Sequence, residues 1–144
     1  MTEKKLNCAA VVFFDKENGK AVLQKVGPES KYGDKQHFFG GKMEAGETPY
    51  ETVMRELSEE LEYKPEGIMF WKKFEYRIDE KNNYFDGWDI TMNMFVAPIS
   101  SGLLSSPVHE GEGMLYLKYE EALGLEGWGK NNKIIFAEFM SEFF

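Results

Sequence analysis

Apolar and polar positions divide the first third of the chain into short strand-like runs separated by polar turns. "CAAVVFF" (8–14) and "AVLQKV" (21–26) are apolar runs with the residues "DKENG" near the turn between them, which predicts two strands. Residues 27–36 are polar and rich in turn formers, so we expect a loop there. "HFF" (37–39) predicts a short strand that leads into two glycines.

The next segment has the period of a helix rather than that of a strand. Its apolar residues recur at four-residue steps, at Val53, Leu57 and Leu61. Thr48 followed by Glu51 forms the capping-box pattern, and Pro49 falls at the first helical position, where its missing N–H costs nothing. We therefore expect a helix over residues 49–61.

The second half returns to strand-like patterns and ends in a helix. Three strands are predicted, at 68–78, 88–99 and 113–119. "EEALGL" (120–125) predicts one helical turn, and "NNKIIFAEFMSEFF" (131–144) predicts a second long helix. Mixed strands with two long helices indicate an α+β fold with a mixed sheet held between helices, as one domain over residues 1–144.

Composition narrows the classes of function. The 144 residues have a net charge of −8, which argues against a broad surface for nucleic-acid polymers but not against a small phosphorylated substrate. No segment is long and apolar enough for a signal peptide or a membrane span. Cys8 is the only cysteine and lies in an apolar run, so we expect a buried thiol and no internal disulfide. We expect a cytoplasmic protein.

Three carboxylates on the predicted helix suggest a cation site. Glu56, Glu59 and Glu60 are neighbours on a helix, away from its apolar stripe, and their like charges repel. A hard divalent cation such as Mg²⁺ takes oxygen ligands of this kind. The alternative is a solvated acidic helix face. The stretch "FFGG" just before the helix favours the cation, because Gly40 and Gly41 allow the backbone to approach an ion or a phosphate closely.

"GKMEAGETPYETVMRELSEELEY" (41–63) resembles the signature box of the Nudix hydrolases, and the small MutT-like members in particular. The box consists of Gly, Glu, Arg-Glu, an aliphatic residue and Glu-Glu at fixed spacing, and the matching positions are Gly41, Glu47, Arg55, Glu56, Leu57, Glu59 and Glu60. Glu62 stands where the box has a helix-ending glycine, and Tyr63 where it has an aliphatic residue. A left-handed Glu62 would cost about 1 kcal/mol. The resemblance implies the Nudix α/β/α sandwich.

The resemblance also implies roles within the box. The family hydrolyses nucleoside diphosphates linked to another group, with Mg²⁺ or Mn²⁺. The implied metal ligands are Glu56, Glu59 and Glu60 with a carbonyl of Gly40 or Gly41. Arg55 would orient these carboxylates and brace Glu47, which would reach a metal through water. The alternative for Arg55 is an ordinary pair with Glu59 on the helix surface.

Outside the box, the resemblance predicts one more carboxylate, as metal ligand or general base, before the strand at 113–119. Glu112 is preferred over Glu110, and a solvated loop acid is the alternative. His109 lies beside them and is expected at the surface. Five further residues are candidates for substrate binding: His37, Tyr84, Phe85, Trp88 and Asn131. Each has a structural alternative: a strand-edge histidine, core aromatics, or an N-cap in the case of Asn131.

The expected substrate is a small-molecule nucleotide. A (deoxy)nucleoside triphosphate, normal or oxidised, would give a monophosphate and pyrophosphate. Nucleotide sugars, ADP-ribose and dinucleoside polyphosphates are the alternatives among enzymes. A domain that senses a nucleotide without cleaving it is the alternative from another class, and the retained glutamates argue against it. We expect no nucleic-acid polymer and no membrane as partner, and a monomer or a homodimer.

Overall fold

The computed structural model describes residues 4–25, 36–81, 84–100, 102–106 and 113–144. Seven strands form one sheet: β1 (Lys5–Asp15), β2 (Lys20–Lys25), β3 (Gln36–His37), β4 (Phe39–Lys42), β5 (Met69–Arg77), β6 (Asp89–Pro98) and β7 (Gly113–Lys118). The helices are α1 (Pro49–Leu61), α2 (Tyr119–Leu123) and α3 (Lys130–Phe143). None of the helices in these ranges combines the length and the apolar character that a membrane crossing requires.

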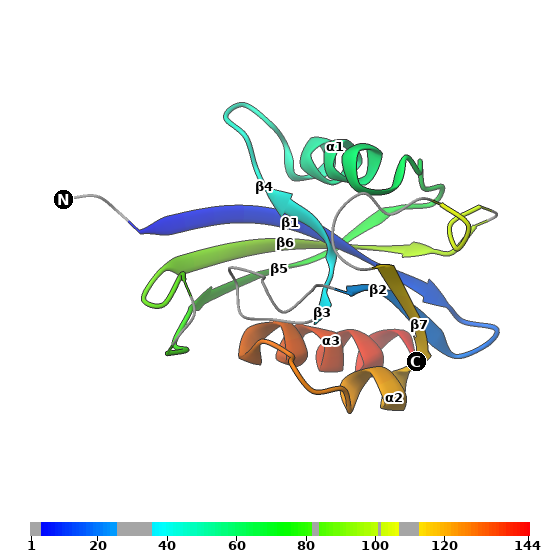
Figure 1. Cartoon of the computed structure of the whole chain (residues 1–144). Coiled ribbons are helices and arrows are strands. Elements are labelled where there is room, and N and C mark those ends of the chain that lie inside the picture. Colours follow the sequence, from blue (N-terminus) through cyan, green and yellow to red (C-terminus); the bar gives the residue numbers. More distant parts are fainter. Residues whose placement is uncertain (1–3, 26–35, 82–83, 101, 107–112) are drawn as a thin grey trace.

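The sheet is mixed, as the sequence predicts. Its main path runs β3-β2-β1-β6-β5, while β4 pairs with β1 and β7 pairs with β2. β1 runs parallel to β6, and the other pairs are antiparallel. In Figure 1, α1 lies above the sheet and α2 and α3 lie below it, so the molecule has the three-layer order helix, sheet, helix.

β1 lies at the centre of the sheet and is buried on both faces, which explains its continuous apolar run. Ala9, Val11 and Phe13 pack in the core beneath α1. Ala10 and Val12 alternate with them and pack in the second core, on the side of α3. The two faces of one strand thus separate two hydrophobic cores.

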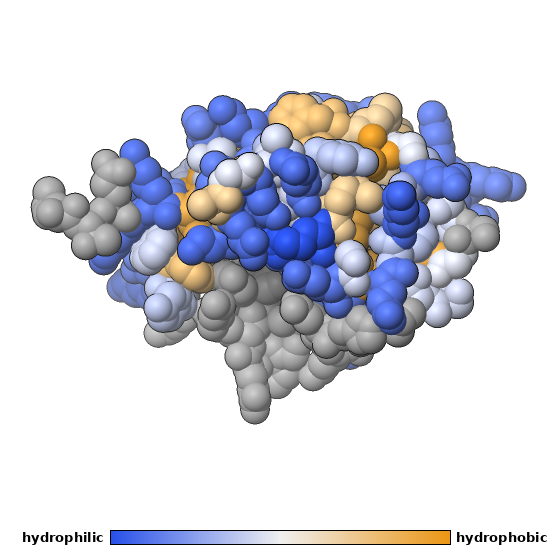
Figure 2. Space-filling model, turned by 90° about the horizontal axis from the view of Figure 1, so that it is seen from above, coloured by the Kyte–Doolittle hydropathy of each residue, from blue (hydrophilic) through white to orange (hydrophobic). Residues whose placement is uncertain are grey.

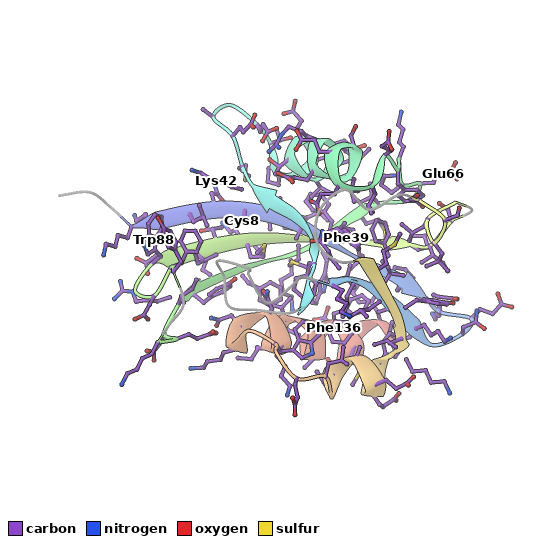
Figure 3. The ribbon with its side chains drawn as sticks, in the orientation of Figure 1. Cys8, Phe39, Lys42, Glu66, Trp88 and Phe136 are labelled. Carbon is purple, nitrogen blue, oxygen red and sulfur yellow. The ribbon has the colours of Figure 1, made fainter. Side chains whose placement is uncertain are left out.

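The helices bury the faces that their sequence periods indicate. Val53, Leu57 and Leu61 of α1 have no exposed surface. Phe136 and Phe139 of α3 are equally buried on the opposite side of the sheet, where Figure 3 labels Phe136. The prediction of a helix at 49–61 is confirmed to the residue, and α3 begins one residue earlier than predicted.

The segment "HFF" differs from its prediction. It belongs to two short strands rather than one, because β3 pairs with β2 whereas β4 turns to pair with β1. Phe38 lies between them. The change of partner places Gly40 and Gly41 against the middle of β1, opposite Ala10 and Ala9. The predicted loop at 27–36 lies, apart from Gln36, outside the described residues.

Candidate active site

The start of α1 is fixed by its own neighbouring residues. Thr48 Oγ1 accepts a hydrogen bond from the Glu51 N–H at 3.1 Å, and Glu51 Oε1 accepts one from the Thr48 N–H at 3.0 Å. Both halves of the predicted capping box are therefore formed. They set the position at which the helix begins, and hence the direction in which the later glutamates project.

Glu47 and Arg55 tie the loop before α1 to the helix. Arg55 Nε and Nη2 donate to the two carboxylate oxygens of Glu47 at 2.7 and 3.1 Å, and Nη2 also donates to the Lys42 carbonyl at 3.1 Å. The hydrogen bonds from Arg55, helped by those from the Glu44 N–H and Thr52, lower the pKa of Glu47 to about 2. Glu47 is therefore an anion engaged with the loop and the helix rather than a free acid.

Glu56 and Glu60 form a carboxylate pair one helical turn apart, in which Glu60 is buried and the Glu56 side chain is 14% exposed. Glu60 is 1% exposed, and its Oε1 is buried without a hydrogen bond to the described residues. A hydrogen bond links the two side chains, and burial raises the pKa of Glu56. Two carboxylates that share a hydrogen bond must also share a proton. A divalent cation can take the place of that proton, so the donor chemistry suits a hard cation.

Glu59 stands apart from this pair. Its side chain is 54% exposed, and its nearest cation is Arg55 Nη1, which lies 3.4 Å from Oε2. The same Arg55 nitrogen donates to Glu56 Oε1 at 3.0 Å. In the described part of the chain, no three or more His, Cys, Asp or Glu side chains are grouped so as to hold a metal ion. Arg55 thus offsets the negative charge of Glu56 and Glu59, two of the predicted ligands. Among the three predicted carboxylate ligands, Glu56 and Glu60 are the pair linked by a hydrogen bond.

Gly40 and Gly41 are both required by close packing, but against different groups. A Cβ on Gly41 would lie 2.6 Å from Oε1 of Glu56. A Cβ on Gly40 would lie 2.2 Å from the Ala9 carbonyl oxygen, and Gly40 has a φ of +152°. β4 therefore packs directly against the Glu56 carboxylate on one side and against the backbone of β1 on the other.

A cleft of about 150 Å³ lies along β1 and β4, toward the α3 side of the sheet. Its apolar wall includes Leu6, Cys8 and Ala10 of β1 and Ile90 and Met92 of β6. Aromatic side chains come from Phe38, Tyr76 and Phe85, and polar groups from Lys42, Glu80, Asn131 and Asn132. Burial raises the pKa of the Cys8 thiol to about 11, so Cys8 contributes a neutral wall.

β4 joins the cleft to the carboxylates. Gly40, Gly41 and Lys42 line the cleft, while Gly41 packs against Glu56 and the Lys42 carbonyl accepts from Arg55. Cys8 and Lys42 are paired across β1 and β4 and lie beside each other in Figure 3. Figure 2 looks down on the α1 side, where hydrophilic residues cover much of the surface. The two parts of the site are therefore neighbours separated by one strand.

The candidates for substrate binding fall in different places. Asn131 lines the cleft at the second position of α3, and the N-cap is Gly129, so the alternative of Asn131 as an N-cap is wrong. Tyr84 is 69% exposed, and neither Tyr84 nor Trp88 lines the cleft. Phe85, whose ring contacts both of theirs, does line it. His37 lies in β3, where its backbone pairs with that of Gln24 in β2.

Other predicted residues cannot be placed in this geometry. Glu112, Glu110 and His109 lie outside the described residues, directly before β7. Conversely, the sequence analysis did not single out Phe38, Glu80 or Asn132 as cleft residues. Asn132 could have been predicted from the sequence, because it follows the candidate Asn131 at the start of the predicted helix. Phe38 and Glu80 join the cleft only through pairing and contacts between distant segments.

Comparison with known proteins identifies relatives over most of the chain. A family model described as the NUDIX domain matches residues 5–139. The 8-oxo-dGTP diphosphatase of Escherichia coli (strain K12) is 34% identical over 79 residues, which are 55% of this chain and 60% of that protein. The 8-oxo-dGTP diphosphatase of Proteus vulgaris is 43% identical over 61 residues, which are 42% of this chain and 54% of that protein. These matches therefore span less than two thirds of each relative.

Solved structures share the fold over nearly the whole length. The MutT protein from Methanosarcina mazei Go1 matches with a TM-score of 0.74, covering 99% of this chain and 97% of its own. The identity is 18%, so the likeness concerns the arrangement of strands and helices rather than the chemistry of the site.

Proposed function

We propose that this chain, which belongs to the NUDIX family, hydrolyses a diphosphate bond in a nucleotide with the help of a divalent cation. The observation that supports this most strongly is the carboxylate pair of Glu56 and the buried Glu60, placed one strand away from a cleft with apolar and amide walls. A nucleotide has a polyphosphate that needs a cation and a flat base that suits such a cleft.

Glu56 and Glu60 would hold Mg²⁺ or Mn²⁺, with Glu59 and a carbonyl of Gly40 or Gly41 as further ligands. When bound, the cation supplies positive charge for the phosphates and makes a water molecule easier to deprotonate. Glu59 is exposed and engaged only with Arg55 among the described residues, so it is free to turn toward a cation.

The chain's own residues position the reacting groups. Arg55 holds the loop before α1 through Glu47 and orients Glu56. In the proposed reaction the oxygen of a water molecule attacks one of the two phosphorus atoms that flank the α–β bridging oxygen. The bond from that phosphorus to the bridging oxygen breaks, and the bridging oxygen leaves with the other product, the nucleoside monophosphate or pyrophosphate. The water's proton goes to a carboxylate, for which Glu112 is our first candidate and Glu110 the second.

The base would lie in the cleft between the apolar wall of β1 and β6 and the aromatic rings of Phe38 and Phe85. Asn131 would bond to its edge, because an amide can both donate and accept. The ribose and phosphates would then pass along β4 toward Glu56. We propose no direct contact between the base and Tyr84 or Trp88, which lie outside the cleft lining.

We propose a (deoxy)nucleoside triphosphate, normal or oxidised, as the substrate, with a monophosphate and pyrophosphate as products. The names of the two curated relatives support an oxidised guanine nucleotide. The test is a panel of dGTP, 8-oxo-dGTP, dATP, ADP-ribose, a nucleotide sugar and a dinucleoside polyphosphate, with Mg²⁺. We expect pyrophosphate release from the triphosphates, and no release after addition of EDTA.

The other outcomes separate the alternatives. Turnover of ADP-ribose or a nucleotide sugar alone would replace the proposed substrate but keep the proposed reaction. Turnover of none of them, together with measurable nucleotide binding by calorimetry, would show a sensing domain and overturn the proposal.

A further inference from the structure

Among the described residues that line the cleft, Glu80 is the one acidic side chain, and the function proposed above gives it no role. It lies between β5 and β6, at a distance in sequence from every other polar residue of the lining. Its Oε1 accepts a hydrogen bond from the Lys130 N–H, the first residue of α3, at 2.8 Å. The helix has no side-chain cap from its own N-cap residue, Gly129. Glu80 therefore supplies, from fifty residues away, the acceptor that a local cap would provide.

The position of Glu80 is itself fixed from the other side. Asp86 Oδ1 accepts a hydrogen bond from the Glu80 N–H at 3.2 Å. The hairpin around it is closed by the bonds from the Gly87 N–H to the Ile78 carbonyl at 2.8 Å and from the Trp88 N–H to the Phe85 carbonyl at 2.9 Å. The carboxylate thus lies between these hydrogen-bonded residues and the first residue of α3, Lys130, which directly precedes Asn131.

One oxygen of this carboxylate remains available to a ligand. Within the described ranges, no residue donates a hydrogen bond to Oε2 of Glu80. An ionised carboxylate can only accept hydrogen bonds, so a partner for Oε2 must carry an N–H or O–H donor. The basic residue among the described lining residues, Lys42, comes from β4, the strand that packs against Glu56 of α1 through Gly41. The cleft therefore offers a cation on the strand next to the carboxylate pair and an acceptor beside α3.

We propose that Glu80 is a specificity-determining residue that accepts a hydrogen bond, through Oε2, from an N–H donor on the edge of the bound base. The inference rests on the proposed function, because it takes the cleft to hold a nucleobase. Guanine presents two adjacent donors, N1–H and the 2-amino group, whereas adenine presents an acceptor at N1. Glu80 therefore favours guanine-type bases, including oxidised ones that keep this edge, over adenine. Asn131 serves the remaining edge of the base.

The test is binding of nucleoside monophosphates, measured by calorimetry, so that no catalysis is needed. Wild-type protein should bind dGMP more tightly than dAMP, with dIMP, which lacks the 2-amino group, in between. In Glu80→Gln the amide oxygen can still accept from the Lys130 N–H, but the other position becomes a donor. We expect dGMP binding to weaken by about tenfold and dAMP binding to change by less than about twofold.

Two further variants separate recognition from structure and from charge. Asp79→Asn removes the neighbouring exposed carboxylate of the same loop and should leave the ratio of dGMP to dAMP binding unchanged. Glu80→Ala removes the cap of α3 as well and should lower the melting temperature, which Glu80→Gln should not. An unchanged ratio in Glu80→Gln, or no measurable binding of dGMP by the wild type, overturns the inference. Failure of the hydrolysis panel with an altered ratio would overturn the proposed reaction alone.

Discussion

The two sides of β4 are built in different ways. On the α1 side, the carboxylate site comes from a single stretch, residues 40–60, and its contacts span at most fifteen positions, from Gly41 to Glu56. On the other side, the cleft combines β1, β4, the hairpin between β5 and β6, and the start of α3. The carboxylate site is therefore local in sequence, whereas the cleft exists only after the sheet has formed.

The two helices beside the site show the same contrast. α1 begins with a capping box made by Thr48 and Glu51, three residues apart. α3 begins at Gly129 without a local cap and receives its acceptor from Glu80. A local cap keeps a helix start in place whatever the rest of the fold does, whereas a distant cap makes the helix start depend on the hairpin. Single substitutions on the carboxylate side should therefore change mainly the catalytic activity. Single substitutions on the cleft side should change mainly the shape of the cleft.

The largest effect is expected from Glu60→Gln on the carboxylate side. It keeps the size of the side chain but removes the charge that a divalent cation needs, so we expect kcat to fall by about 100-fold or more. Without a cation the same change should not destabilise the protein, because the new amide can still donate a hydrogen bond to Glu56 in place of the shared proton. Melting curves with and without Mg²⁺ measure this: Mg²⁺ should raise the melting temperature of the wild type and not that of the variant.

Glu66→Gln is the matched control for Glu60→Gln. Glu66 is exposed in the loop after α1, and Figure 3 labels it at the right-hand side of the molecule, away from Lys42. This variant should keep both the activity and the shift with Mg²⁺. Full activity in Glu60→Gln would remove Glu60 from the set of metal ligands.

A smaller effect, which separates the two sides of β4, is expected from alanine at its glycines. In Gly41→Ala the new Cβ would meet the Glu56 carboxylate, the far end of a flexible side chain, so Glu56 moves and the fold persists. We expect activity to fall by about 10- to 100-fold with little change in stability. In Gly40→Ala the new Cβ would meet the backbone of β1, so the free energy of unfolding should fall by about 1–3 kcal/mol.

Urea denaturation and steady-state rates distinguish these outcomes. If Gly41→Ala loses as much stability as Gly40→Ala, then both glycines serve packing alone. Equal activity of Gly41→Ala and the wild type would mean that the position of Glu56 seen here is not the active one.

The range of each contact explains what the sequence could predict. The helix at 49–61 and its cap follow from spacing along the chain, whereas the bonds from Arg55 to Glu47 and Glu56 were expected from the resemblance to the family box. The strands were found, because each carries its own apolar pattern. The division of "HFF" between β3 and β4 was not, because only the choice of partner strand decides it.

The cleft was beyond local patterns for the same reason. Tyr84, Phe85 and Trp88 were all candidates for stacking on a base, and of the three only Phe85 lines the cleft. Neighbours in a turn point in different directions, and their sequence does not say which one faces the sheet. Likewise, the start of α3 depends on Glu80, so no pattern within residues 129–132 indicates that Gly129 rather than Asn131 is the N-cap.

The smallest effect concerns the end of α1. The prediction of a left-handed helix end at Glu62 is confirmed: Glu62 has φ 50° and ψ 34°, and no other non-glycine residue in the described ranges has a positive φ. A side chain in this conformation is strained, and glycine is not. Glu62→Gly should therefore raise the free energy of unfolding. The gain should be about 0.5–1 kcal/mol, because the greater freedom of glycine in the unfolded chain cancels part of the relieved strain. Activity should not change.

Glu62→Ala is the control that isolates the backbone. It removes the same carboxylate but keeps a Cβ, so its free energy of unfolding in urea should stay close to that of the wild type. Equal stabilisation by alanine and glycine would mean that charge, not backbone strain, is relieved at this position. A loss of activity in Glu62→Gly alone would mean that the strained helix end helps to position Glu59 and Glu60, and the end of α1 would then belong to the chemistry of the carboxylate side.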